Sequence, residues 1–368
     1  MAKIKYREAL RVALREEMER DPSVFCLGEG IGERGGSYKV TEGLIAQFGP
    51  RRVMDTPLSE AGFVGLGVGA AIAGSRPVVE MLFIDFLLLA MDQLVNQAAK
   101  YRFMSGGQGH VPLVVRTQGG AGNSLAGQHS QSLEAMFCHV PGLKVVMPST
   151  PADAKGLLKA AIRDDDPVVF IEHKLLYMTD GEVPDDEDYV VPLGRADVKR
   201  PGSDVTLVAW SHMATKCMTA AAQLEAEGIS VEVIDLRTLV PMDTGTVLES
   251  VGRTGRLVIA QEAVKRGGVA SDVAATVAEQ AYGQLRAPIV RVAGRNTVIP
   301  FNLALERASV PQVEDVIAAG GFGHVAVEEL ADVAIKGKEE PVCLYRISPR
   351  QHGEPTSIGR SAANAPRA

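Results

Sequence analysis

The chain has 368 residues, of which 46% are hydrophobic and 23% charged, and its formal net charge is −7. This length suggests two domains of ordinary size plus a remainder, while the negative charge and the lack of a basic run argue against nucleic-acid binding. The apolar stretches are too short to span a bilayer, so we expect no membrane partner. Four scattered cysteines without a Cys-x-x-Cys pair, and a start without an apolar signal core, favour a reducing, cytoplasmic location over a zinc site or disulfide framework.

The first part of the chain alternates predicted strands and helices. Repeated strand–helix units imply a mostly parallel sheet that is covered by helices on both faces. In chain order we expect a helix over 6–20, a strand over 24–27, a helix over 41–48, a strand over 53–55, a small-residue helix over 65–74, a strand over 78–82, a helix over 87–104, strands over 113–116 and 145–147, a helix from 151 and a strand over 168–171.

A second set of such units follows an acidic, turn-forming stretch, which indicates a linker. We expect strands over 204–210, 231–235, 256–260 and 288–292, and a helix over 214–227. The predicted domain boundaries are 1–178, 179–203 for the linker, 204–319, and 320–368 for a C-terminal extension. Within that extension, 325–335 predicts an amphipathic helix and 342–346 a strand, whereas 347–368 lacks apolar periodicity and is typical of disorder.

The chemically most informative stretch is D-T-P-L-S-E-A-G-F, residues 55–63. Glu60 lies there among small and apolar neighbours, and poor solvation of a carboxyl group raises its pKa towards neutrality. Such a group can exchange protons in catalysis. The alternative is a helix start, with Ser59 as the cap and Glu60 interacting with the helix dipole.

Two glycine-rich segments invite a functional interpretation. Residues 30–35, G-I-G-E-R-G, match the dinucleotide fingerprint, but glycines continue past it and no helix opens within it, so we expect a loop instead. Residues 119–127 are glycine-rich and precede His129, which such a loop can present at a cleft and which titrates near neutrality. The alternative for His129 is an ordinary histidine at a helix start. His110, His139, His173 and His212 lack comparable surroundings and are interpreted as structural.

These motifs resemble the beta subunit of the thiamine-diphosphate-dependent decarboxylase component of 2-oxo-acid dehydrogenase complexes. The resemblance covers about residues 4–320 and includes T-P-L-S-E, A-Q-H-S-Q in the form A-G-Q-H-S-Q, I-D-L-R-T-L-V-P and Q-E-A-V-K-R-G-G, in the expected order. It implies an α/β fold of two doubly wound domains. The first would be a thiamine pyrimidine-binding domain with a mostly parallel sheet, and the second a transketolase-like C-terminal domain.

The resemblance also implies roles for individual residues. Glu60 matches the glutamate that hydrogen-bonds N1′ of the cofactor's aminopyrimidine, Phe86 the aromatic that packs on that ring, and Leu58 a residue beside it. Glu29 matches an acidic residue near the same pocket, although the family usually has a second acidic residue where Gly30 stands here. His129 matches a histidine that faces the reacting substrate and the lipoyl group.

A structural potassium ion is a further implication of the resemblance. The family binds it mostly through backbone oxygens, and an oxygen cage suits a hard cation. Many relatives have Asn where Asp166 stands, which matters little if the ligand is a backbone carbonyl. Without the resemblance, this acidic stretch would be interpreted as a solvated helix end. The matching positions are Leu113, Ala161, Ile162, Asp164 and Asp166.

One motif is absent. Thiamine enzymes hold magnesium and the diphosphate through G-D-G followed by an asparagine, and this sequence has no G-D-G. We therefore expect an alpha subunit to hold magnesium and complete the site in an assembly of two alpha and two beta chains. The expected reaction is decarboxylation of a small 2-oxo acid, pyruvate first, and acyl transfer to a lipoyl arm of the acyltransferase core. Alternatives are an acetoin or branched-chain enzyme, or a noncatalytic assembly partner.

Overall fold

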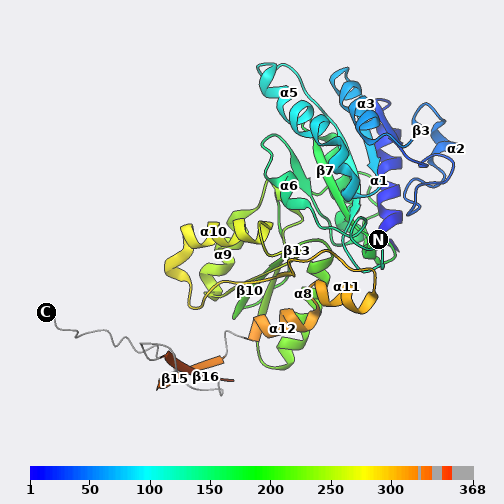
Figure 1. Ribbon diagram of the computed structural model, residues 1–368. Helices are drawn as coiled ribbons and strands as arrows, with labels where there is room; N and C mark the ends of the chain where they lie inside the picture. The colour runs from blue at the N-terminus through cyan, green and yellow to red at the C-terminus, as the bar shows by residue number, and fades with distance from the viewer. Residues whose placement is uncertain (322–324, 334–341, 350–368) are drawn as a thin grey trace. The chain divides into compact units, whose positions relative to one another are not determined.

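The computed structural model describes residues 1–321, 325–333 and 342–349. Internal contacts divide the chain into a large unit, Met1–Gly320, and a small one, Gly321–Ala368. Two mostly parallel sheets with helices around them form most of the large unit (Figure 1). Among the described residues, no helix is both long and apolar enough to cross a membrane.

A seven-stranded sheet forms the first half of the large unit. Neighbouring strands run parallel except for β12 and β6 at one edge. In spatial order the strands are β12 (Thr238–Val240), β6 (Lys144–Val146), β7 (Val168–His173), β5 (Val114–Gly119), β4 (Arg76–Met81), β2 (Val24–Gly28) and β3 (Val53–Asp55). The predicted mostly parallel sheet is confirmed, and every strand predicted for this region overlaps an observed one.

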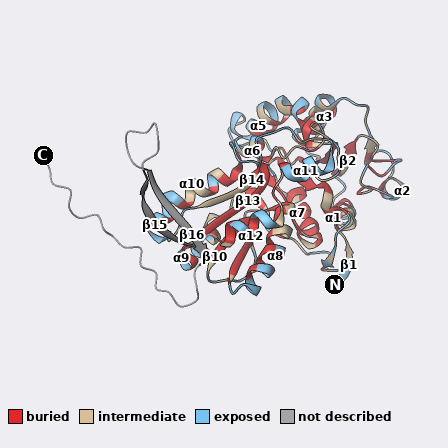
Figure 2. Cartoon of the chain, turned by 60° about the horizontal axis from the view of Figure 1, so that its bottom comes forward, coloured by how far each residue is buried: buried red, intermediate tan, exposed pale blue. Residues whose placement is uncertain are grey.

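Helices cover both faces of this sheet. On one face, α1 (Tyr6–Arg20) packs against α7 (Pro151–Arg163), and Leu10 and Leu158 belong to their common apolar core. The other face is covered by α3 (Glu60–Ile72) and by the helical run from Ile84 to Met104. The buried residues accordingly lie in the sheets and on the inner sides of the helices (Figure 2).

The small residues of α3 let this helix approach the sheet closely. A Cβ atom at Gly67 would lie 2.7 Å from Cγ2 of Val79 in β4, closer than packed carbon atoms come. The glycine-rich segment is therefore a tightly packed helix, as predicted. This close packing fixes the start of α3, where Glu60 lies.

A five-stranded sheet forms the second half. Its strands, in spatial order, are β14 (Val290–Gly294), β13 (Leu257–Val264), β10 (Val205–Ala209), β11 (Val231–Asp235) and β9 (Asp197–Arg200), of which only β9 runs antiparallel to its neighbour. Its helices are α8 (Ser211–Ala226), α9 (Thr244–Thr254), α10 (Val269–Ala281), α11 (Leu303–Ser309) and α12 (Val313–Gly321). Two doubly wound α/β domains are thus confirmed.

The two halves interlock. Strand β12 follows β11 in the chain but joins the edge of the first sheet beside β6. One apolar core contains residues from both halves. Val145 of β6 comes from the first half, and Trp210, which follows β10, and Ile234 of β11 come from the second. This shared core holds loops of the second half against loops of the first.

Several predicted elements differ from the structure. The helix expected from Thr41 begins only at Leu44 (α2, Leu44–Phe48), because Gly43 is left-handed with φ 84° and Thr41 Oγ1 donates to the carbonyl of Ile31 instead. The run expected as one helix over 87–104 is helical but changes its hydrogen-bond spacing. Its parts are α4 (Ile84–Leu87), a 3-10 turn η1 (Leu88–Ala90), a π-helix η2 (Asp92–Ala98) and α5 (Ala99–Met104).

The segment predicted as a linker, 179–203, contains two strands. Strand β8 (Asp180–Val183) pairs antiparallel with β1 (Ala2–Lys5), and β9 joins the second sheet. The remaining short elements of the large unit are α6 (Glu134–Cys138), η3 (Lys174–Leu176) and η4 (Tyr282–Gln284).

In the small unit the helix predicted over 325–335 is wrong. Strand β15 (Val325–Val333) pairs antiparallel with β16 (Val342–Pro349), with Val333 opposite Val342. The segment begins V-A-V, and alternating β-branched residues favour a strand when a partner strand is present. The predicted strand over 342–346 lies within β16 and is confirmed. Of the predicted disorder, residues 350–368 lie outside the described residues.

Candidate functional site

Most of the predicted site residues lie at one edge of the seven-stranded sheet. Glu29 follows β2, Glu60 follows β3, Phe86 follows β4 and His129 follows β5. Because these strands are parallel, their carboxyl ends meet at the same edge, where open α/β sheets bind ligands. The topology therefore gathers residues that are far apart in the chain.

Glu29 and Glu60 form an acidic pair at this edge. The pKa of Glu29 is raised, first by burial and then by the charge of Glu60. One carboxylate oxygen of Glu29, Oε1, is buried without a hydrogen-bond partner. Ser59 makes no capping hydrogen bond to α3, so the helix-cap alternative for this motif lacks its main contact. Leu58 is 81% exposed.

The ring of His129 lies between two phenylalanines. Its centroid is 5.2 Å from that of Phe83 and 5.2 Å from that of Phe86, both edge to face. The Lys174 ammonium donates a hydrogen bond to the backbone carbonyl of His129 and lies 5.3 Å from the Phe83 ring centroid. Burial lowers the pKa of Lys174. The structure thus brings His129 and Phe86 together, as expected for one site.

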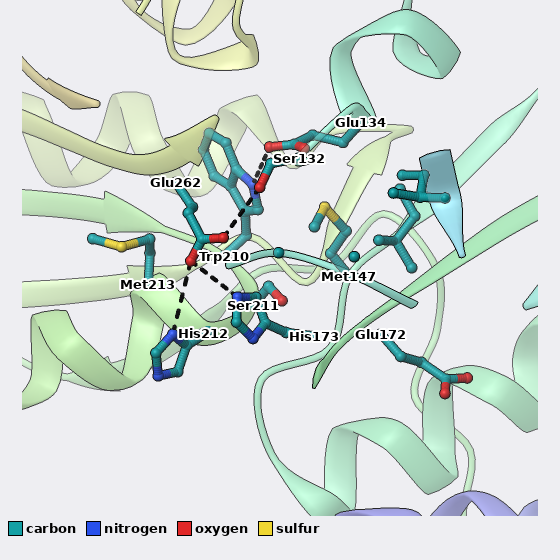
Figure 3. Close-up of a pocket in the computed structure, with 14 residues that line it drawn as sticks. Ser132, Glu134, Met147, Glu172, His173, Trp210, Ser211, His212, Met213 and Glu262 are labelled. Carbon is teal, nitrogen blue, oxygen red and sulfur yellow. Dashed lines mark hydrogen bonds and ion pairs between the residues drawn. The ribbon is translucent and has the colours of Figure 1, made fainter. Parts of the chain in front are cut away.

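The glycine-rich segment before His129 is held by carboxylates from the second half of the chain. Glu262 Oε1, from β13, accepts a hydrogen bond from the backbone N–H of Ala121 at 2.8 Å. The same oxygen accepts from Ser132 Oγ at 3.2 Å (Figure 3). Glu306, from α11, accepts from the backbone N–H groups of Gly122 and Ser124 at 2.8 and 2.9 Å.

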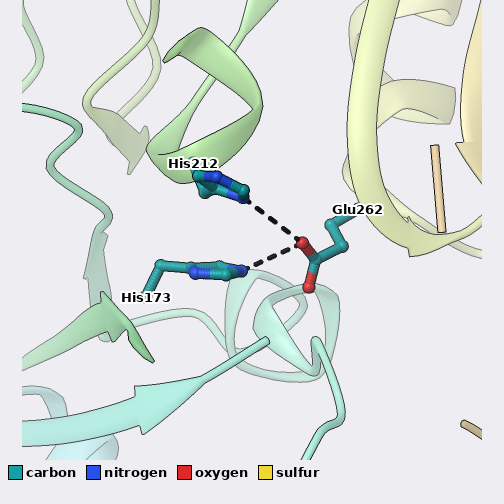
Figure 4. A group of neighbouring side chains, drawn as sticks. All are labelled: His173, His212 and Glu262. Carbon is teal, nitrogen blue, oxygen red and sulfur yellow. Dashed lines mark hydrogen bonds and ion pairs between the residues drawn. The ribbon is translucent and has the colours of Figure 1, made fainter. Parts of the chain in front are cut away.

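Glu262 also faces two histidines, His173 at the end of β7 and His212 in α8 (Figure 4). Its Oε2 lies 2.9 Å from His173 Nε2 and 3.9 Å from His212 Nδ1. Burial alone would raise the pKa of Glu262, but interaction with His173, first of all, and then the hydrogen bond from the Ala121 N–H hold that pKa well below the usual range. Burial lowers the pKa of His212.

This cluster has the ligand types of a metal site, with all three groups within 4.8 Å of one another. However, His173 Nδ1 accepts a hydrogen bond from the backbone N–H of Leu175 at 3.2 Å. A neutral imidazole that accepts at Nδ1 carries its proton on Nε2, the nitrogen that faces Glu262. That proton occupies the position a metal would need, so the arrangement fits a hydrogen-bonded carboxylate.

A small cavity of about 20 Å³ adjoins the cluster, between Gly120, Glu134 and Trp210. That volume accommodates about one water molecule. Burial raises the pKa of Glu134 to about 6, although Trp210 Nε1 donates to its Oε1 at 3.3 Å. Glu134 Oε2 and Ser211 Oγ are buried without a partner.

The positions predicted for potassium lie at the opposite end of the same strands. The carbonyls of Ile162 and Asp164 both accept hydrogen bonds from Arg76, at 3.1 and 2.9 Å, and that of Leu113 accepts from Val168. The Asp164 carboxylate pairs with Lys144 at 2.6 Å, and Asp166 pairs with Arg102 at 2.7 Å. The carbonyl of Ala161 accepts from the backbone N–H of Asp164.

The sequence prediction missed the groups that support His129, and it interpreted His173 and His212 only as structural. Glu262 lies in Q-E-A-V-K-R-G-G, a segment used for the resemblance but given no role. Lys174 lies three residues after the predicted strand over 168–171, and its position near the carboxyl end of that strand was the available signal. His110 and His139 are exposed.

Comparison with known proteins gives consistent matches. The profile of the transketolase pyrimidine binding domain matches residues 2–179, and that of the transketolase C-terminal domain matches residues 194–316. A solved structure titled "Split gene transketolase, inactive beta4 tetramer" superposes with a TM-score of 0.70 at 27% identity, covering 86% of this chain and 97% of that one.

Curated relatives are closer in sequence. The pyruvate dehydrogenase E1 component subunit beta of Rhizobium meliloti is 50% identical over 319 residues, which are 87% of this chain and 69% of the relative. The acetoin:2,6-dichlorophenolindophenol oxidoreductase subunit beta of Cupriavidus necator is 49% identical, covering 86% and 96%. The 2-oxoisovalerate dehydrogenase subunit beta of Bacillus subtilis is 47% identical, covering 87% and 98%.

Proposed function

The chain belongs to the transketolase-like family of 2-oxo-acid dehydrogenase beta subunits, and we propose that it acts in a pyruvate dehydrogenase. In this proposal it binds the aminopyrimidine of thiamine diphosphate and acts on pyruvate together with an alpha subunit. The acidic pair Glu29–Glu60 carries the proposal, because it places an unpartnered, buried carboxylate oxygen at the ligand-binding edge of the sheet.

The residues at this edge fit the pyrimidine half of the cofactor. When bound, thiamine diphosphate supplies a carbon nucleophile that adds to the 2-oxo carbon and accepts the electron pair left by carbon dioxide. Glu60 would hydrogen-bond the ring nitrogen of the aminopyrimidine and serve there in proton exchange, as a positioned carboxyl group can do. Phe86 offers an aromatic face to the ring, and the exposed Leu58 an apolar contact beside it.

His129 is proposed to act on the substrate. The two phenylalanines fix its ring, and Lys174 fixes its backbone. A histidine held in this way can exchange a proton with the substrate or orient the lipoyl group. We propose His129 as the second catalytic residue beside Glu60.

The diphosphate half of the site requires another chain. The sequence has no G-D-G motif, so an alpha subunit would hold magnesium and the diphosphate in an assembly of two alpha and two beta chains. Exposed apolar side chains at Leu58, Leu66 and Leu89 provide surface for such a partner. The assembly would transfer its acyl group to the lipoyl arm of an acyltransferase core.

Two finer elements of the proposal concern ions and location. The carbonyls of Leu113, Ala161, Ile162 and Asp164, with Asp166, are proposed to bind structural potassium; each carbonyl has a second lone pair beside the hydrogen bond it accepts. A cytoplasmic location is proposed from the scattered cysteines, of which Cys26, Cys138 and Cys217 are free thiols.

The test is co-expression with an alpha chain, followed by assays with pyruvate, branched-chain 2-oxo acids and acetoin. The proposal expects a tetramer whose highest kcat/KM is for pyruvate. The acetoin reading rests on the relative matched over 96% of its length, and a preference for acetoin would establish it. An assembled tetramer that turns over none of these substrates would identify a noncatalytic partner.

A further inference from the structure

We propose that Glu262 is a positioning residue for His129: it closes the neck of the loop from Gly120 to Gln131 and so fixes the conformation in which His129 works. This inference rests on the proposed function, in which His129 contacts the substrate. It assigns a role in the reaction to a carboxylate of the second half of the chain.

The neck of the loop is a set of short contacts around one carboxylate oxygen. The backbone N–H of Gly120 donates to the carbonyl of Gln131 at 3.0 Å. Glu262 Oε1 then accepts from Ala121 on one side of the neck and from Ser132 on the other, at 2.8 and 3.2 Å. Because one oxygen contacts both ends, its loss removes an attachment from each end of the segment that carries His129 and leaves the Gly120–Gln131 hydrogen bond to close the neck.

The loop needs such support because its backbone is unfavourable. Ser124 and Ala126 have φ values of 53° and 60°, in the left-handed region that non-glycine residues avoid. Backbone of this kind persists only where its surroundings fix it, and it concentrates at functional sites. Glu306 supplies a second attachment at Gly122 and Ser124, inside the loop.

The other oxygen of Glu262 contacts His173, the residue before Lys174, which holds the backbone of His129. Oε2 accepts from His173 Nε2, and the next residue, Lys174, donates to the carbonyl of His129. Gly120 has φ 88°, and a Cβ atom there would collide with the His173 ring, so loop and ring are packed tightly. Glu262 therefore holds the neck and the His173–Lys174 segment in one arrangement.

Mutation of the assembled alpha–beta enzyme tests this role. In Glu262→Ala we expect kcat to fall roughly tenfold to a hundredfold, the scale of a misplaced catalytic group, with cofactor affinity and KM within about twofold. Glu262→Gln keeps a carbonyl oxygen that can accept from Ala121 and Ser132 but turns its NH2 group towards the Nε2 proton of His173, so only part of the loss should be restored. Glu232→Ala is the matched control, because Glu232 is a buried carboxylate of the same sheet that pairs with Arg253 and does not contact the loop.

A double-mutant cycle separates positioning from general stability. If Glu262 acts through His129, Glu262→Ala should not lower kcat further in the His129→Ala background, because coupled residues are not additive. If Glu262→Ala lowers kcat by the same factor with His129 present and in the His129→Ala variant, the proposal is overturned.

Hydrogen exchange gives a readout that does not depend on the reaction. Faster amide exchange over residues 119–132 in Glu262→Ala, but not in Glu232→Ala, supports the closed neck, and unchanged exchange there overturns it. A native enzyme without turnover on any 2-oxo acid would refute the proposed function, while the exchange experiment would still decide whether Glu262 closes the loop.

Discussion

Two polar regions of the seven-stranded sheet contrast sharply: the buried charges around Arg116 and the acidic pair at the edge. The Arg116 guanidinium, 1% exposed, binds both oxygens of Glu172 at 2.7 and 2.8 Å and one oxygen of Glu80 at 2.8 Å. Tyr177 donates its hydroxyl to Glu172 at 2.6 Å. At the edge, by contrast, Glu29 keeps an unpartnered oxygen and Leu58 is exposed.

The charges around Arg116 neutralise one another within the fold, whereas we infer that the carboxylates of Glu29 and Glu60 bind a ligand. Burial raises the pKa of Glu80 more than the Arg116 guanidinium lowers it, but Glu80 is ion-paired with this residue of the chain's own fold. Burial, and then the charge of a second carboxylate, raise the pKa of Glu29, and its buried Oε1 has no hydrogen-bond partner. We infer that the edge is completed from outside the chain, by cofactor and partner.

The largest effect is expected at Glu60. Glu60→Gln keeps the size of the side chain but removes its proton exchange, so activity of the assembled enzyme should fall by about two to four orders of magnitude, the range for an acid–base group. The melting temperature should change little, because Glu60 lies half-buried in the first turn of α3 and its side chain makes no hydrogen bond or salt bridge among the described residues. Steady-state kinetics and calorimetry on the same preparations check both parts; near-normal turnover would make Glu60 a helix-start residue.

At Arg116 the reverse pattern is expected. Arg116→Met leaves Glu80 and Glu172 buried without a cation, which typically costs about 3–5 kcal/mol. The free energy of unfolding, measured with denaturant, should fall by that amount or the protein should fail to accumulate. Arg102→Met, at an exposed pair, is the control and should leave stability unchanged; an equally stable Arg116→Met protein would remove the contrast between the two regions.

Glu134 should show a smaller, pH-dependent effect. Its pKa in the folded state is about 6, above the 4.5 of a free glutamate, because burial favours the protonated form. The native protein therefore loses stability as pH rises from about 4.5 through 6, and a shift of this size corresponds to roughly 2 kcal/mol in full.

Glu134→Gln stays neutral and can still accept from Trp210. The free energy of unfolding of this variant, relative to that of the native protein, should rise by about 1 kcal/mol between pH 5 and pH 8. The rise is smaller than the full change of about 2 kcal/mol because the native protein has already lost part of its stability at pH 5. Melting curves of both proteins at the two pH values measure this. A difference that does not change with pH would show that Glu134 titrates normally.

The sequence predicted the order of the sheet elements because fully buried parallel strands are short apolar runs between helices. The strand over 231–235 and the helix from 151 were predicted from local patterns of this kind. The crossing of β12 into the first sheet was not predictable, because three residues, Thr238–Val240, carry no periodicity and the pairing is set by the tertiary structure. The helix predicted over 325–335 failed because short apolar patterns fit both periods.

The residues of the candidate site also differ in whether a local sequence pattern could predict them. Glu60 and His129 lie in motifs whose residues are contiguous, and the resemblance located them. Glu262 acts on residues 141 positions earlier in the chain, a relation that no local pattern contains. The sequence therefore indicated the groups that we propose to face the ligand and missed the groups that hold them.

The central claim is that this chain carries one half of a thiamine diphosphate site, and cofactor binding tests it most directly. Titration calorimetry with thiamine diphosphate and magnesium should be run on the purified chain and on the chain assembled with an alpha subunit. We expect binding, one cofactor per beta chain, and pyruvate decarboxylation only in the assembly. Tight binding and sustained decarboxylation by the chain alone would contradict the claim.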